Sequence, residues 1–175
     1  MTSTPLLDNS LNLNDLLDTM YHGIAEKLQN LNQDDIVMIG IHTGGFWIAE
    51  QLHKRLGLSS PLGSLNISFY RDDFTKIGLH PEVKPSKLPP ALDDKHIILI
   101  DDVLFTGRTI RAALNEIFDY GRPASVTLAV LLDRGERELP ISADITGQTI
   151  SLEPHQQVKL SGPDPLNLFL VQDDS

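Results

Sequence analysis

The 175-residue sequence contains no cysteine. A disulfide framework and a metal site built on thiolates are therefore excluded. The sequence also has no apolar run approaching the roughly 18 residues that a membrane-spanning helix needs. Residues 1–14 carry neither lysine nor arginine and no long apolar stretch, which argues against a secretory signal peptide. We therefore expect a cytoplasmic protein without a membrane partner.

Basic residues are scarce as well. Lysine and arginine together number 14, against 24 aspartates and glutamates, and the formal net charge is −10. Sequence-independent binding to nucleic acid relies on cations that neutralise phosphates, so this charge argues against it while leaving room for a local basic patch. The six histidines show no ligand spacing such as His-Glu-x-x-His, so we predict no metal held directly by the protein.

What the sequence does contain is typical of a folded domain. Apolar residues make up 41% of the chain, and 175 residues can bury a sizeable core in a single domain. Residues 1–12, rich in Thr, Ser, Pro and Asn, are expected to be frayed. A helix should follow, with Asn14 or Asp15 as its N-cap and an apolar face between Leu16 and Leu28.

The most informative stretch of the sequence is residues 97–109. Residues 97–100 are all apolar, which predicts a buried strand, and two adjacent aspartates stand where that strand should end. The segment Thr106-Gly107-Arg108-Thr109 then leads into a helical pattern of apolar residues. In open α/β sheets, ligands bind at the carboxyl ends of the strands, so this loop is a candidate ligand site.

The residues of this loop suit a ribose 5-phosphate. A helix N-terminus offers unpaired N–H groups to a phosphate, and Gly107 allows positive φ and close backbone approach. The ionised side chains of Asp101 and Asp102 accept hydrogen bonds only, which suits the two hydroxyls of a ribose diol. A Walker A loop is excluded because Gly-x4-Gly-Lys-Ser/Thr is absent. The alternative interpretation is an ordinary βα turn with a capping threonine and solvated aspartates.

A second strand–loop–helix unit precedes this one. Residues 36–41 predict a buried strand, residues 42–45 a glycine-rich loop, and residues 47–56 a helix, so this loop is either a second anion site or a plain turn. Residues 65–70 alternate as a strand does, and residues 71–95 form a long proline-rich loop of the kind that is usually functional. Further strands are expected at 125–132, 141–145, 148–152, 157–160 and 168–171.

These motifs resemble those of a known family. Residues 97–109 are similar to the phosphoribosyl-pyrophosphate (PRPP) signature of type I phosphoribosyltransferases. The variant Asp-Asp-Val-Leu, an aromatic residue, then Thr-Gly-Arg-Thr resembles the PyrR family, whose members are pyrimidine-operon attenuators and also uracil phosphoribosyltransferases. Residues 69–73, 121–123 and 133–141 agree with the same family. The similarity extends from about residue 36 to residue 158.

The resemblance implies an α/β fold, with a parallel core sheet flanked by helices and a small hood. Residues 1–175 would form a single phosphoribosyltransferase domain, with 71–95 as a flexible loop and about 133–160 as hood and base pocket. The implied reaction is that of a glycosyltransferase in pyrimidine salvage: uracil and PRPP give UMP and pyrophosphate, with Mg²⁺ bound mainly through PRPP. The family also implies a homodimer or a larger homo-oligomer.

The resemblance also implies roles for individual residues. The catalytic positions would be Asp101, Asp102 and Arg137, the last of these directed at the leaving pyrophosphate. The PRPP- and UMP-binding loop would be Val103, Leu104, Phe105, Thr106, Gly107, Arg108 and Thr109. The pyrophosphate loop would be His42, Thr43, Gly44 and Gly45, the flexible loop would contribute Tyr70 and Arg71, and the base pocket would contain Arg134 and Val158. Phe105 stands where many relatives have Asp, so no general base is assigned.

Two departures from the family pattern affect function. The pyrophosphate loop usually reads Lys-Thr-Arg-Gly, so residues 42–45 have weakened or lost two cations here, and replacing Gly44 with Arg should tighten pyrophosphate binding if the backbone tolerates a side chain. In the hood, RNA-regulating members usually have His, Arg and Lys where this chain has Glu136, Ser142 and Gln148. Each lost cation removes a phosphate contact, so we expect weakened binding to an mRNA leader.

Two alternatives remain. The first is a UMP-sensing, RNA-binding transcription attenuator, which would use another surface such as Lys54 and Arg55. The second is a purine phosphoribosyltransferase, which Phe105 disfavours because purine enzymes usually have Asp at that position.

Overall fold

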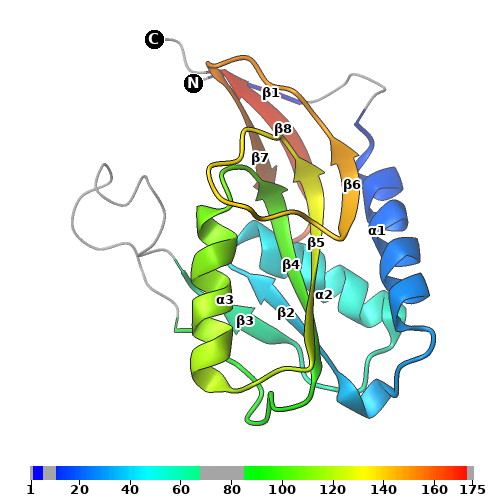
Figure 1. The fold of residues 1–175 in the computed structure, drawn as a ribbon. Coiled ribbons are helices and arrows are strands. Elements are labelled where there is room, and N and C mark those ends of the chain that lie inside the picture. The colour runs from blue at the N-terminus through cyan, green and yellow to red at the C-terminus, as the bar shows by residue number, and fades with distance from the viewer. Residues whose placement is uncertain (1, 6–10, 68–84, 173–175) are drawn as a thin grey trace.

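The computed structural model describes residues 2–5, 11–67 and 85–172. Its helices and strands alternate along most of the chain, and Figure 1 labels them. In order they are β1 (Thr2–Pro5), α1 (Leu13–Leu28), a 3₁₀ turn (Gln33–Asp35), β2 (Ile36–Ile41), α2 (Gly44–Leu56), β3 (Gly63–Leu65), β4 (His96–Leu104), α3 (Arg108–Tyr120), β5 (Ser125–Asp133), β6 (Ile145–Thr149), β7 (Gln156–Ser161) and β8 (Asn167–Gln172).

The core is a five-stranded sheet in the order β3-β2-β4-β5-β6, with every neighbouring pair parallel. All six residues of β2 are buried, as are Ile97 to Asp101 in β4. Such continuous apolar runs are what a parallel sheet covered on both faces requires. The parallel core sheet flanked by helices that the sequence predicts is therefore confirmed.

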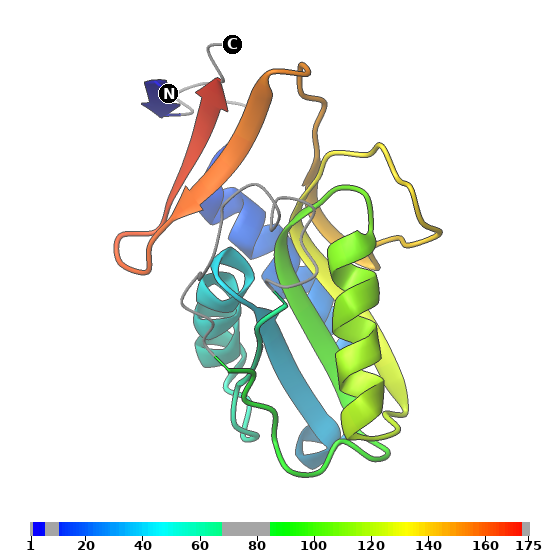
Figure 2. The same ribbon diagram turned by 90° about the vertical axis from the view of Figure 1, so that its left-hand side faces the viewer.

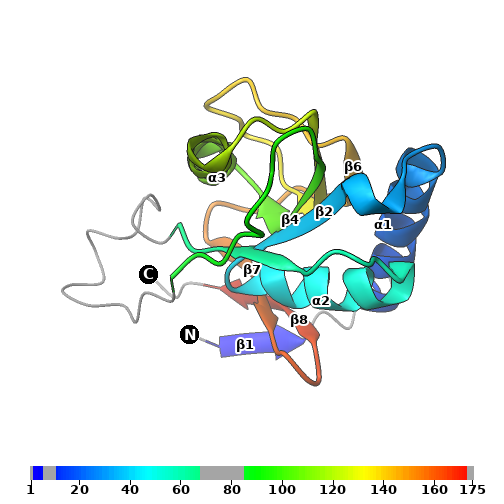
Figure 3. The same cartoon turned by 90° about the horizontal axis from the view of Figure 1, so that it is seen from below.

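Helices cover both faces of this sheet. Figure 3 shows α1 and α2 on one side of the strands and α3 on the other. Two buried apolar clusters match these two layers: one contains Met20 of α1 and Leu52 of α2, and the other contains Ile117 of α3. The first helix begins earlier than expected, because Asn12 is its N-cap and its side chain accepts a hydrogen bond from the Asp15 N–H, rather than Asn14 or Asp15 capping it.

The hood is a separate antiparallel sheet in the order β1-β8-β7 (Figure 2). Its composition differs from the sequence expectation in two ways. Thr2–Pro5 is not frayed but pairs with β8 as a strand. Conversely, β6 is not a hood strand, since it pairs parallel to β5 at the edge of the core sheet. Both differences depend on pairing with strands far away in the sequence, which local patterns do not reveal.

The strand expected over 65–70 is displaced toward the N-terminus as far as it is described, since β3 covers Gly63–Leu65, residues 66 and 67 belong to no strand, and residues 68–70 lie outside the described ranges. Residues 68–84, which include Tyr70, Arg71 and much of the long loop predicted over 71–95, lie outside the described residues. The end of that loop is anchored, because Lys87 and Ser64 exchange two backbone hydrogen bonds of 2.8 Å. None of the helices in the described ranges is long and apolar enough to span a membrane.

Candidate active site

Two carboxylates lie at the carboxyl end of β4. The strand continues to Leu104, so Asp101 and Asp102 stand within it rather than after it. Asp101 is only 3% exposed, and its Oδ1 accepts a hydrogen bond from the Asp102 N–H at 2.9 Å. Asp102 Oδ1 accepts in turn from the Val103 N–H at 2.8 Å. These bonds fix two acceptor-rich side chains side by side at the edge of the sheet where α/β folds bind ligands.

The loop that follows β4 ends in an open helix N-terminus. Gly107 is the N-cap of α3, with φ of 94° and ψ of −6°, and, being a glycine, it makes no side-chain capping hydrogen bond. Thr106 Oγ1 accepts from the Arg108 N–H at 3.2 Å. The positive φ is the conformation that favours glycine, and the first-turn N–H groups that follow Arg108 point at the space in front of the helix. The loop therefore has the geometry of a phosphate site.

A second segment, residues 134–141, braces this phosphate loop from outside. The Thr106 carbonyl accepts from the N–H groups of Glu138 at 2.9 Å and Leu139 at 3.2 Å. Arg108 Nε donates to Glu138 Oε2 at 2.6 Å. A Cβ on Gly107 would lie 3.1 Å from the Ile141 side chain. The phosphate loop is thus held between the end of β4 and this brace.

Arg137 is the central residue of the brace. Its guanidinium donates to the Phe105 carbonyl at 2.7 Å, the Ile141 carbonyl at 2.8 Å and Asp133 Oδ2 at 2.6 Å. The hydrogen bond from Arg137 is the main reason that the pKa of Asp133 lies below its usual value, and the Gly135 N–H adds to it against the opposing effect of burial. These contacts turn Arg137 toward the protein, while its expected role at pyrophosphate stays a prediction.

Arg134 and Phe105 form the next part of the site. The Arg134 guanidinium lies over the Phe105 ring, with Cζ 3.8 Å from the ring centroid. Arg134 Nε is buried and has no hydrogen-bond partner among the described residues. A buried donor without a partner is costly, so this atom is suited to a ligand acceptor that enters the site. The flat guanidinium and ring also offer a planar surface.

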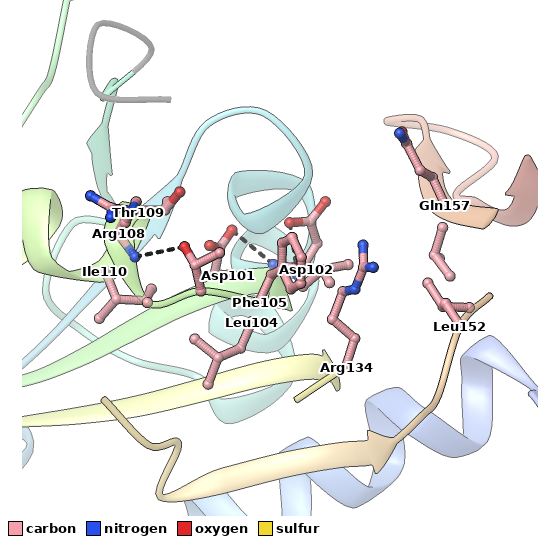
Figure 4. Close-up of a pocket in the computed structure, with 14 residues that line it drawn as sticks. Asp101, Asp102, Leu104, Phe105, Arg108, Thr109, Ile110, Arg134, Leu152 and Gln157 are labelled. Atoms are coloured by element: carbon pink, nitrogen blue, oxygen red, sulfur yellow. Dashed lines mark hydrogen bonds between the residues drawn. The ribbon is translucent and has the colours of Figure 1, made fainter. Parts of the chain in front are cut away.

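One cavity of about 410 Å³ connects these parts. Figure 4 shows the start of α3 with Arg108 and Thr109 at one end, Asp101 and Asp102 between, and the hood strand with Gln157 at the other. The residues lining it are Asp101, Asp102, Val103, Leu104, Phe105, Thr106, Gly107, Arg108, Thr109, Ile110, Arg134, Leu152, Gln157 and Val158. The sequence-predicted loop and both predicted base-pocket residues therefore meet at one cavity.

Leu152, Gln157 and Ile110 line this cavity without having been singled out from the sequence. Gln157 precedes Val158 on β7, but adjacent strand residues point to opposite faces, so the strand pattern gave no signal for it. Leu152 lies between β6 and β7 in a segment without regular structure, and no local pattern marks it.

The predicted pyrophosphate loop approaches the carboxylates from another side. A Cβ on Gly44 would overlap the Asp102 carboxylate, and a Cβ on Gly45 would lie 2.7 Å from the Ile100 carbonyl oxygen. His42 stacks on Phe46 with ring centroids 4.6 Å apart, and the His42–Thr43 peptide bond is cis. Among the described residues, the lining of the 410 Å³ cavity does not include this loop. The loop abuts the site without forming its wall.

Within the described residues, no group of three or more His, Cys, Asp or Glu side chains is arranged to hold a metal ion. Mg²⁺ needs only one or two carboxylates when substrate oxygens and water supply its other ligands. Asp101 and Asp102 are the carboxylates that would meet such a substrate-borne ion.

Comparison with known proteins agrees with this geometry. Residues 12–162 match the family described as the phosphoribosyl transferase domain. A Nitrosococcus oceani protein named bifunctional protein PyrR is 58% identical over 165 residues, covering 93% of each chain. Proteins of the same name from Pseudomonas paraeruginosa (65% identical over 130 residues, 74% of this chain and 76% of that one) and Pseudomonas aeruginosa PAO1 (56% over 154 residues, 88% and 91%) also match.

Solved structures of low sequence identity show the same fold. A hypoxanthine-guanine-xanthine phosphoribosyltransferase superimposes with a TM-score of 0.65 at 18% identity, covering 93% of this chain and 92% of its own. A hypoxanthine phosphoribosyltransferase from Staphylococcus aureus gives 0.66 at 22% identity, with coverage of 87% and 85%. Together with the high identity to the PyrR proteins, these matches show that the chain belongs to the PyrR family of the phosphoribosyl transferase domain proteins.

Proposed function

We propose that this protein is a uracil phosphoribosyltransferase that converts uracil and PRPP into UMP and pyrophosphate in cytoplasmic pyrimidine salvage. The observation that carries the proposal is the order of groups along one cavity: a helix N-terminus, two carboxylates, and the planar surface formed by Arg134 and Phe105. This order matches the 5-phosphate, the diol and the base of UMP. The bifunctional PyrR relatives support the same function.

In the proposed reaction the bond between ribose C1 and the pyrophosphate oxygen breaks, and a bond from uracil N1 to C1 forms. Pyrophosphate leaves with the bonding electrons, and the N1 proton departs to solvent or to the leaving group. The ribosyl group carries positive charge as the bond breaks, so the nearby carboxylates of Asp101 and Asp102 stabilise it electrostatically. The remaining rate enhancement comes from orientation, because the site holds the phosphate end and the base end of the reactants in line.

The base end of the cavity suits a pyrimidine with an amide edge. β7 is an edge strand of the hood, so its outer backbone groups have no strand partner within the described residues. A backbone N–H and C=O at Val158 would pair with uracil O4 and N3–H, and cytosine would present the opposite pattern. Arg134 Nε, buried and unpartnered in the described chain, offers a further donor to a base carbonyl. Phe105 and Arg134 would pack beside the ring.

Mg²⁺ would be bound mainly by PRPP oxygens and water, neutralising the pyrophosphate as it leaves. The cationic positions of the family's usual pyrophosphate loop are His42 and Gly44 here, so backbone N–H groups at the start of α2 would supply most of that contact. PRPP affinity should therefore depend strongly on Mg²⁺.

The proposal is tested by measuring PRPP-dependent consumption of uracil, hypoxanthine and guanine with Mg²⁺ present. We expect uracil to be consumed and the two purines to be poor substrates. Efficient use of hypoxanthine or guanine with no use of uracil would replace the proposal with a purine enzyme. The Asp102→Asn variant serves as the control that activity belongs to this cavity.

A second candidate function is UMP-responsive binding to a pyrimidine mRNA leader, which the relatives' description as bifunctional favours. The described surface favours it less. Glu136 and Ser142 are exposed where RNA-regulating relatives usually carry cations, and Arg55 of the alternative surface pairs with Asp18 at 2.8 Å and lies over Tyr21. We expect weak RNA binding with a shallow salt dependence, since each missing phosphate contact removes about 0.7–0.9 from the log–log slope.

Filter binding against the protein's own pyrimidine leader transcript, with and without UMP, decides between the two functions. If the protein binds the transcript with submicromolar affinity at physiological salt, and UMP strengthens this binding, transcription attenuation would become the preferred function.

A further inference from the structure

The turn between β7 and β8 rests on the first turns of α2. A Cβ on Gly162 in this turn would lie 3.0 Å from Trp47 Cε3 and 2.8 Å from Leu166 Cδ1. Gly162 is not among the glycines with positive φ, so space rather than backbone conformation restricts this position. Figure 2 shows the β7–β8 hairpin lying above α2. Trp47 thus forms the surface on which the hood turn sits.

The same stretch of α2 also touches the ribose end of the site. Gly44 and Gly45, the first residues of α2, pack against Asp102 and Asp101 so closely that neither position has room for a Cβ. Trp47 follows two residues later on the same helix. One short stretch of helix therefore lies between the carboxylates on one side and the hood on the other.

The hood is packed as a body on this helix layer. Leu160, Leu166 and Leu168 are half-buried and pack against the core cluster that includes Ile48 and Leu52 of α2. Val158, which lines the cavity, lies four residues before Gly162 on the same hairpin. Because a packed interior deforms little, the contact between Gly162 and Trp47 determines the position of Val158 relative to Asp102.

We propose that Trp47 is a positioning residue, whose indole against Gly162 sets the spacing between the hood strand that receives the base and the carboxylates that receive the ribose. This inference rests on the proposed function, because the spacing matters only if base and ribose are joined in this cavity. Trp47 touches neither reactant in this arrangement. It acts by holding uracil N1 at the reaction distance from ribose C1, where a displacement of about 1 Å costs on the order of 10²-fold in rate.

The test is the Gly162→Ala variant, which inserts one methyl group between the hood turn and the indole. We expect KM for uracil to rise about tenfold and kcat to fall, with KM for PRPP changed less than about twofold, because only the base side is displaced. Gly121→Ala is the matched control: its Cβ would meet Asp93 Oδ1 at 3.0 Å, its φ is 172°, and it follows α3 at the end far from the cavity.

A compensating variant separates positioning from stability. In Trp47→Phe/Gly162→Ala the smaller ring makes room for the methyl group, so KM for uracil should return toward the wild-type value. Trp47→Phe alone covers the case in which Gly162→Ala does not fold, and it should raise KM for uracil more than KM for PRPP. Equal changes in both KM values, or no change in a folded variant, would overturn the proposal, as would failure of the double variant to restore uracil binding.

Failure of the proposed function would look different. It would appear as a wild-type protein that consumes no uracil, whereas the inference fails only through the variants. In that case the positioning role is read from UMP and PRPP affinities measured by calorimetry. Gly162→Ala should then weaken UMP more than PRPP, and an equal loss would overturn it. Trp47 is the single tryptophan of the chain, so its fluorescence should also change when UMP binds to the wild type.

Discussion

The units β2–α2 and β4–α3 are built alike but lie differently at the site. Each has a buried parallel strand, a glycine-bearing loop and a helix that begins at once. The β4–α3 loop has its glycine in the left-handed region, is braced by residues 134–141 and lines the cavity. In the β2–α2 unit, by contrast, Gly44 and Gly45 pack closely against the two aspartates of β4. The same local pattern thus forms a cavity-lining loop after β4, whereas after β2 it forms a close-packed contact with the aspartates.

The largest effect is expected from a substitution that disrupts the phosphate loop between β4 and α3. Gly107→Val places a β-branched side chain at φ of 94° and against Ile141, so the loop must change shape. Losing two charge-assisted hydrogen bonds of about 1.5–3 kcal/mol each should weaken UMP and PRPP by at least ~100-fold in calorimetry. Gly57→Val is the control, because Gly57 also has positive φ but no described atom within 4 Å of its added Cβ. Tight UMP binding by Gly107→Val would place the phosphate elsewhere.

The next effect concerns Asp102, which lies in β4 and packs against Gly44 at the start of α2. Asp102→Asn keeps the shape and the acceptor for the Val103 N–H but removes the charge. We expect kcat/KM to fall by about 10²-fold, as for the loss of one preorganised polar group, with the free energy of unfolding changed by less than about 1 kcal/mol. Asp119→Asn, exposed on α3, is the control. An unchanged kcat/KM would remove Asp102 from the reaction.

A smaller effect tests the support loop. The sequence alone favours a gain in pyrophosphate affinity from Gly44→Arg, but the structure puts the new Cβ into the Asp102 carboxylate. We now expect a roughly tenfold fall in kcat/KM because Asp102 is displaced. Asn30→Arg adds the same charge at an exposed position in the turn after α1, away from the cavity, and should leave kcat/KM nearly unchanged. Tighter pyrophosphate binding by Gly44→Arg with full turnover would contradict this packing argument.

The smallest expected effect is on the free energy of unfolding, and it tests how much the brace, residues 134–141, contributes to stability. Because Arg137 lowers the pKa of Asp133, the folded protein favours the ionised form. That stability is fully present above the usual Asp pKa of about 3.9 and is lost as pH falls through the lower folded value. Asp133→Asn should therefore cost about 1–3 kcal/mol in denaturant unfolding at neutral pH, and less below about pH 4.

The exposed pair Arg55–Asp18 provides the comparison, since Asp18→Asn should cost only about 0–1 kcal/mol. A cost at Asp133 no larger than at Asp18 would show that the brace contributes little.

Much of the fold was predictable from the sequence because apolar runs and glycine-bearing loops are local signals. The strand at residues 36–41, the apolar part of β4 at residues 97–100 and the helix after Gly107 came from such signals. The frayed terminus and the hood assignment of residues 145–149 were wrong in detail, since Thr2–Pro5 and β6 become strands by pairing with β8 and β5. The role of Arg137 at pyrophosphate comes from the family resemblance and stays a prediction, while the structure adds its hydrogen bonds to Asp133 and two carbonyls.

The sequence by itself determined the two strand–loop–helix units and the chemistry of the phosphate loop, because burial, positive φ at glycine and helix-end N–H groups depend on neighbours a few residues apart. Tertiary structure decided which groups meet. The contact of Gly44 with Asp102, the seat of Gly162 on Trp47 and the stacking of Arg134 on Phe105 join residues far apart in the chain. Such contacts follow from how whole layers pack, and no periodicity along the chain encodes them.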